Sequence, residues 1–144
     1  MDALEAYAEG TYSSLQYLSL EALGLQSAVF DHIASHIGKA AGISAVLRGM
    51  PLLAAAPGGS GTVVLPLDAC AEHGLRQEDV LRVGGAAEGL KDAVFRIATL
   101  ANDHLITARK TLEEAGREAN GVAFSSFMHA VGAIFLLWFF RISY

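Results

Sequence analysis

DHIASHIGKAAGISAVLRGMP, residues 31–51, is the stretch that decides the fold of this chain. Small residues recur in it at spacings of four and three, which predicts one long helix with a narrow face of small side chains. These residues are Ala34, Gly38, Gly42 and Ala45. Each glycine costs a helix about 1 kcal/mol relative to alanine. A sequence tolerates that cost where another backbone packs closely against the face or where a ligand binds along it, and both alternatives stay open.

The same helix carries part of a longer motif. Residues 37–48 read IGKAAGISAVLR, and Val64-Leu65-Pro66 follows after a loop. This pattern resembles the second signature of the squalene/phytoene synthase family, LGxAxQLTNILRD followed by a YLP segment. The resemblance extends from Tyr7 to about Arg109. It implies an all-α fold, here a partial isoprenoid-synthase-type helical bundle.

The residues that bind metal in that family are replaced in this chain. In active members one Asp follows the Arg of the signature and a second lies four residues later. Their carboxylates hold magnesium against a substrate diphosphate, since a hard cation requires oxygen ligands. The corresponding residues here are Gly49 and Leu53, and the Gln and Asn of the signature are replaced by Gly42 and Ala45. The resemblance therefore implies a pseudoenzyme with no catalytic residue, metal or other cofactor.

Three segments narrow the resemblance to one branch of the family. They are YAEGTYSSLQYLSLEALG at 7–24, DHIASHIGKAAGI at 31–43 and VLPLDACAEHGLRQEDVLR at 64–82. Members of this branch support the assembly of respiratory complex I in mitochondria. The resemblance implies complex I subunits or other assembly factors as partners, and a location at the mitochondrial inner membrane.

The former substrate cavity is the binding surface that this resemblance implies. We expect it to be lined by Gly38, Ala41, Gly42 and Ala45. Arg48, on the same helix, could anchor an anion or an acidic partner.

Composition limits the remaining possibilities. The 144 residues are 53% hydrophobic and 17% charged, which suits one domain with a substantial core. The net charge of −5 argues against a nucleic-acid-binding surface, which normally carries a basic patch. The single cysteine, Cys70, excludes an internal disulfide and fits a buried thiol.

The two ends of the chain differ from its centre. Residues 1–38 contain acidic residues but no Lys or Arg, whereas a mitochondrial leader is rich in arginine. We therefore expect a partial chain that begins downstream of a leader, with a helical domain at 1–117 and a divergent hydrophobic tail at 118–144. Residues 122–140 carry no formal charge and are long enough to span a membrane. A membrane helix, the altered tail of a truncated chain and an ordinary core helix stay open for them.

Apolar periodicity and helix breakers predict the other elements. The predicted helices cover 3–24, Ser27 to Pro51, 66–73, 77–82 and 86–115. His32 and His36 lie one turn apart, but HIASH lacks the glutamate of a zinc-protease helix, so we expect partial burial and hydrogen bonds to neighbouring helices. We expect Asp103 and His104 to lie on a solvated face.

These patterns leave three functions to be distinguished. The first is non-catalytic support of complex I assembly. The second is a magnesium-dependent prenyl-diphosphate transferase, which Gly49 and Leu53 oppose. The third is a small membrane-anchored helical adaptor defined by its tail.

Overall fold

The chain folds into helices. The computed structural model describes residues 1–55, 61–116 and 127, and within these residues it contains no strand. The predicted all-α fold class is therefore confirmed. The predicted boundary between residues 1–117 and 118–144 stays a prediction. So does the membrane association of residues 122–140, which lie outside the described residues apart from Phe127.

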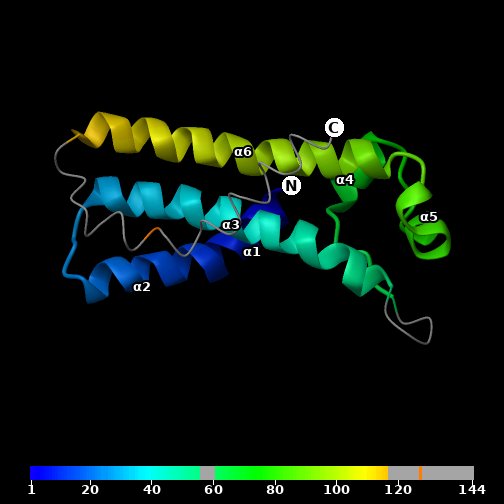
Figure 1. Cartoon of the computed structure of the whole chain (residues 1–144), viewed down its shortest axis with the longest axis horizontal. Coiled ribbons are helices and arrows are strands. Elements are labelled where there is room, and N and C mark those ends of the chain that lie inside the picture. The colour runs from blue at the N-terminus through cyan, green and yellow to red at the C-terminus, as the bar shows by residue number, and fades with distance from the viewer. Residues whose placement is uncertain (56–60, 117–126, 128–144) are drawn as a thin grey trace.

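Three long helices form the body of the molecule (Figure 1). They are α1 (Asp2–Ala8) continued by the π-helical turn η1 (Glu9–Ser13) and α2 (Ser14–Ala22), then α3 (Ala28–Ala54), and finally α6 (Leu90–Ala115). We call α1, η1 and α2 together the first helix. Both the first helix and α6 pack along α3, which lies between them (Figure 1).

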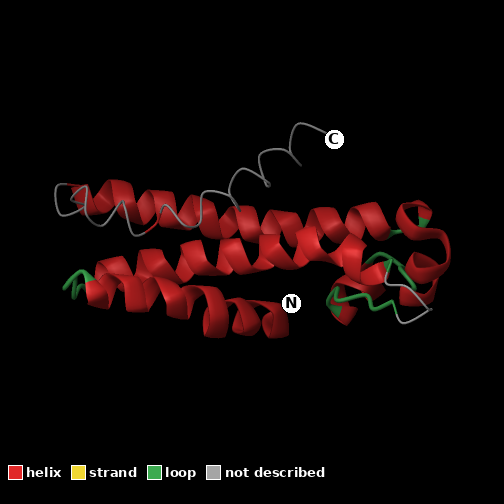
Figure 2. Cartoon of the chain, turned by 60° about the horizontal axis from the view of Figure 1, so that its bottom comes forward, coloured by secondary structure: helices red, strands yellow, loops and turns green. Residues whose placement is uncertain are grey.

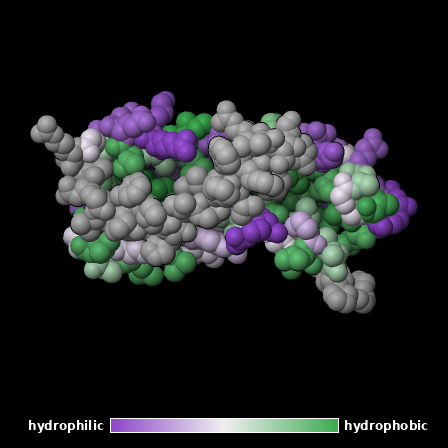
Figure 3. Space-filling view, viewed as in Figure 1, coloured by the Kyte–Doolittle hydropathy of each residue, from purple (hydrophilic) through white to green (hydrophobic). Residues whose placement is uncertain are grey.

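The central helix α3 is apolar around most of its circumference, as a helix packed on two sides must be. By length and composition it is the one described helix that could cross a membrane, but half of that stretch is buried inside the molecule. A core helix passes the same test, and packing on two sides accounts for its composition. Hydrophilic residues follow the outer edge of α6, whereas hydrophobic residues lie exposed along α2 (Figure 3).

Short helices close one end of the body (Figure 2). They are α4 (Leu67–Glu72), α5 (Gln77–Val83) and the 3-10 turn η3 (Gly84–Ala86). Gly89 has φ of +76° and approaches the carbonyl of His73 so closely that a Cβ atom would overlap it. Because this conformation is not helical, α6 begins at Leu90 and not near residue 86 as the sequence predicted.

The predicted end of the second helix at Pro51 is wrong, because α3 continues to Ala54. A proline inside a helix removes one hydrogen bond, here the bond from its own nitrogen to the carbonyl of Leu47. The loss is tolerated in the last turn, where the backbone N–H of Ala55 donates to the carbonyl of Pro51 at 3.1 Å.

The π-helical turn keeps one face of the first helix directed at its neighbours. The buried residues of this helix are Leu4, Ala8, Ser13, Gln16 and Leu20. Their spacing is four, five, three and four, and the step of five crosses η1. A π turn accommodates one additional residue, so Ser13 stays on the buried face where a regular helix would rotate it away.

Two glycines of α3 set its distance from the first helix. A Cβ atom on Gly38 would overlap the backbone of Ser13, and a Cβ atom on Gly42 would lie 2.6 Å from Cβ of Ala8. Ser13 and Ala8 are completely buried. Backbone packing, one of the two alternatives that the sequence left open, therefore accounts for both glycines.

This packing predicts opposite effects for two alanine substitutions in α3. Gly38→Ala should lower the free energy of unfolding by about 1–3 kcal/mol, because its Cβ overlaps backbone atoms. Gly49→Ala should raise it by up to about 1 kcal/mol, because nothing lies within 4 Å of the new Cβ and alanine favours the helix. Urea denaturation followed by far-UV circular dichroism measures both values. Equal stability of the two variants would contradict the close contact.

Candidate functional site

The residues predicted to line a cavity do not share one environment. Gly38, Ala41 and Gly42 are buried, Ala45 is partly exposed and Arg48 is exposed. Gly38 and Gly42 are covered by the first helix, whereas Ala41 belongs to an apolar cluster. Arg48 directs its charge to solvent one turn further along α3. A binding role for these residues stays a prediction.

Gly49 and Leu53, which the resemblance predicts to stand at the metal-ligand positions of the family, provide no oxygen ligand. Gly49 has no side chain, and Leu53 is an exposed aliphatic residue. Among the described residues, no group of three His, Cys, Asp or Glu side chains is arranged to hold a metal ion. Neither Gly49 nor Leu53 can therefore supply a carboxylate to magnesium.

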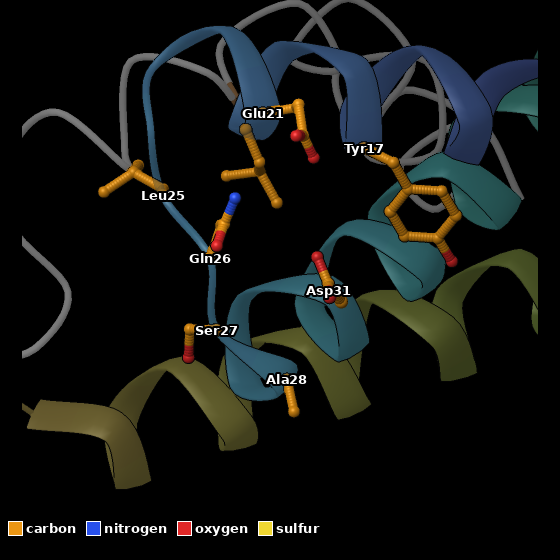
Figure 4. Close-up of a pocket in the computed structure, with 8 residues that line it drawn as sticks. Tyr17, Glu21, Leu25, Gln26, Ser27, Ala28 and Asp31 are labelled. Atoms are coloured by element: carbon orange, nitrogen blue, oxygen red, sulfur yellow. The ribbon is translucent and has the colours of Figure 1, made fainter.

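A cavity of about 490 Å³ opens between α2 and the beginning of α3. Its lining includes Tyr17, Glu21 and Asp31, which Figure 4 labels, and Leu20 contributes an apolar wall. None of its described lining residues is basic. The two carboxylates give the cavity a negative charge, which by itself repels a diphosphate.

A polar network crosses the contact between the first helix and α3. Tyr17 donates a hydrogen bond to Glu9, whose other oxygen accepts one from Ser35 at 2.8 Å and lies 3.7 Å from Nζ of Lys39. Burial raises the pKa of the Glu9 carboxyl. The hydrogen bonds of Tyr17, Ser35 and Ser13 and the charge of Lys39 outweigh that effect, so the pKa lies below its usual 4.5. Glu9 is therefore held ionised where two helices meet.

A second network joins α1, α3 and α6. Nε2 of His104 lies 2.8 Å from Oε1 of Glu5, and Nδ1 of His104 lies 2.8 Å from Nδ1 of His36. The rings of His32 and His36 meet edge to face at 4.6 Å between centroids. Because Glu5 and His36 contact opposite nitrogens of His104, the three side chains do not converge on one point as metal ligands would.

Sequence reasoning predicted part of this second network. The expected partial burial and hydrogen bond to a neighbouring helix are confirmed for His36, whereas the expected burial is wrong for His32, which is exposed. The expectation of a solvated face holds for Asp103, which is exposed, but is wrong for His104, which is 8% exposed. The available signal was its spacing, because His104 lies three residues after Ala101 and so falls on the buried stripe of α6.

The Glu9 network predicts the effect of Tyr17→Phe. Loss of the phenol hydrogen bond should raise the pKa of Glu9 toward 4.5, as measured by NMR titration of its carboxyl carbon. A lowered carboxyl pKa stabilises the fold above the unfolded value, and this stability is lost as the pH falls through the folded value. The variant should therefore lose less stability on acidification than the parent. An unchanged Glu9 pKa would contradict the assignment, and Tyr7→Phe on the exposed side of the same helix is the control.

Comparisons with known proteins agree with this architecture. The family model described as squalene/phytoene synthase matches residues 1–134. A protein of Rattus norvegicus named NADH dehydrogenase (ubiquinone) complex I, assembly factor 6, is 43% identical over 128 residues, which cover 89% of this chain and 36% of that protein. Its Homo sapiens counterpart is 47% identical over 106 residues, which cover 74% and 30%.

The Drosophila melanogaster homolog of the same assembly factor is 41% identical over 107 residues, which cover 74% of this chain and 31% of that protein. The chain thus spans about a third of the length of these relatives. No solved structure matches it. The helical fold, the altered second signature and the match of the family model over nearly the whole sequence lead to one conclusion: this chain belongs to the squalene/phytoene synthase family.

Proposed function

We propose that this chain acts without catalysis in the assembly of mitochondrial respiratory complex I. The observation that carries the proposal is 43% identity, over 89% of the chain, to a protein named as a complex I assembly factor. The names of the relatives support a mitochondrial location. Association with the inner membrane, and complex I subunits or other assembly factors as partners, are part of the same proposal.

The described residues support a binding role better than a catalytic one. Gly49 and Leu53 stand where the family's transferases carry magnesium ligands, and neither side chain can bind a cation. The exposed aliphatic residues Leu15 and Leu18, with 61% and 66% of their surface accessible, give the first helix an apolar outer face. Apolar surface of this kind suits contact with another protein.

In this proposal only two of the five residues predicted to form the binding surface contact the partner directly. Gly38, Ala41 and Gly42 serve it indirectly, because they place α3 against its neighbours. Ala45 and Arg48 are the accessible members of the set. The exposed guanidinium of Arg48 would pair with an acidic group of the partner.

A charge reversal tests this surface without disturbing the core. In cells that lack the full-length protein, a version carrying the Arg48→Glu change should accumulate normally but restore less complex I than the parent. The matched change at Arg109, an exposed arginine of α6, should restore it fully. Complex I is measured by native gel electrophoresis. Full rescue by both variants would show that Arg48 is not part of the binding surface. Failure of the parent to restore complex I would contradict the proposed assembly function.

Enzyme assays test the absence of catalysis. Purified full-length protein incubated with farnesyl or geranylgeranyl diphosphate and Mg²⁺ should release no pyrophosphate above the level seen without Mg²⁺, because no carboxylate pair holds the cation. The double variant Gly49→Asp, Leu53→Asp places two carboxylates at these positions and is therefore the matched comparison for magnesium binding. Magnesium-dependent release of pyrophosphate by the unaltered protein would favour a prenyl-diphosphate transferase instead.

A further inference from the structure

Three helices that are distant in sequence meet at one buried imidazole. His104 of α6 contacts Glu5 of α1 through Nε2 and His36 of α3 through Nδ1, each at 2.8 Å. The side chain of His104 is nearly inaccessible, so water cannot readily replace either partner. The first contact joins α1 to α6, and the second joins α3 to α6.

The distances between Glu5, His104 and His36 determine which nitrogen atoms carry hydrogen. A carboxylate can only accept, so Nε2 of His104 carries the hydrogen that Glu5 receives. Only one hydrogen fits between the two Nδ1 atoms at 2.8 Å, and it belongs either to His36 or to His104. The imidazole pair therefore keeps both hydrogen bonds when it is neutral and when it holds one extra proton. A second extra proton would place two N–H groups and two positive charges face to face.

We propose that Glu5, His104 and His36 form an acid-sensitive clamp that holds α1, α3 and α6 together and opens when both imidazoles are protonated. This inference is independent of the proposed function, since it concerns the stability of the three-helix body. It requires only the contacts of these side chains.

The surrounding charges set the pH at which the clamp opens. Burial is the main cause that lowers the pKa of His36 from 6.5 to about 4, followed by the charges of His104, His32 and Lys39, whereas Glu9 opposes them. Glu5 faces His104 from α1, Glu9 belongs to η1, and His32 and Lys39 lie on α3 with His36.

The lowered pKa determines the sign of the pH effect. Between pH 6.5 and 4 the unfolded chain binds a proton at this histidine that the folded chain refuses. Stability contributed by the clamp is therefore present above pH 6.5 and is lost as the pH falls toward 4.

The test compares two histidine substitutions on one helix. His36→Asn keeps a donor near the position of Nδ1 but cannot be protonated. His32→Asn removes the neighbouring ring and its charge but leaves His36 able to bind the proton. In the parent and in His32→Asn, the folding equilibrium constant should fall by up to about tenfold per pH unit from this single proton. This pH-dependent fall of the folding equilibrium constant should be absent in His36→Asn. Urea denaturation of the 144-residue chain across this pH range measures it.

A second measurement on the unaltered chain does not depend on any variant. NMR of the ring nitrogens at neutral pH should show that the hydrogen of the His104 ring is on Nε2. A pH titration should show that His36 gains its second ring hydrogen only well below pH 6.5. Titration of His36 near 6.5 in the folded chain would overturn the clamp. The same slope in the parent and in His36→Asn would overturn it as well.

Discussion

The close approach of the first helix to α3 is the constraint on which the rest of the structure depends. Gly38 and Gly42 have no Cβ, so the backbone at Ser13 and the side chain of Ala8 occupy that space. At this separation a short Ser35 side chain of α3 can reach a carboxylate of the first helix. Larger residues on α3 would move the helices apart and break the polar contacts along with the apolar ones.

Apolar and polar contacts have different roles in this body. Two apolar clusters run along α3. One is shared with α1, the short helices and the first half of α6, and the other with α2 and the second half of α6. Burial of such clusters drives folding, but it is not directional and tolerates sliding of one helix along another. Hydrogen bonds require defined distances and angles, so the networks of Glu9 and His104 select one register of the three helices. The π-helical turn contributes to the same register, because it directs Ser13 toward α3.

Membership of the family concerns the residues that pack the helices, whereas catalysis in the family concerns the residues that bind magnesium. Small and apolar residues line α3 and pack it against its neighbours. By the resemblance, the two magnesium-binding carboxylates of the family would fall at Gly49 and Leu53, which both lie within this helix. Because a fold does not by itself fix a function, a helical bundle of this family is compatible with the role proposed in complex I assembly.

The sequence by itself determined the helical fold class, the approximate extent of the helices and which residues stand at each motif position. These features depend on local periodicity, on breakers such as Gly74 and on residue identity. Only the tertiary structure decided that the small-residue face of α3 meets a backbone, that α3 continues through Pro51, and that His104 is buried against Glu5 and His36. The physical reason is that each of these depends on which helix lies beside which, a relation between residues as far apart as Glu5 and His104 that no local pattern contains.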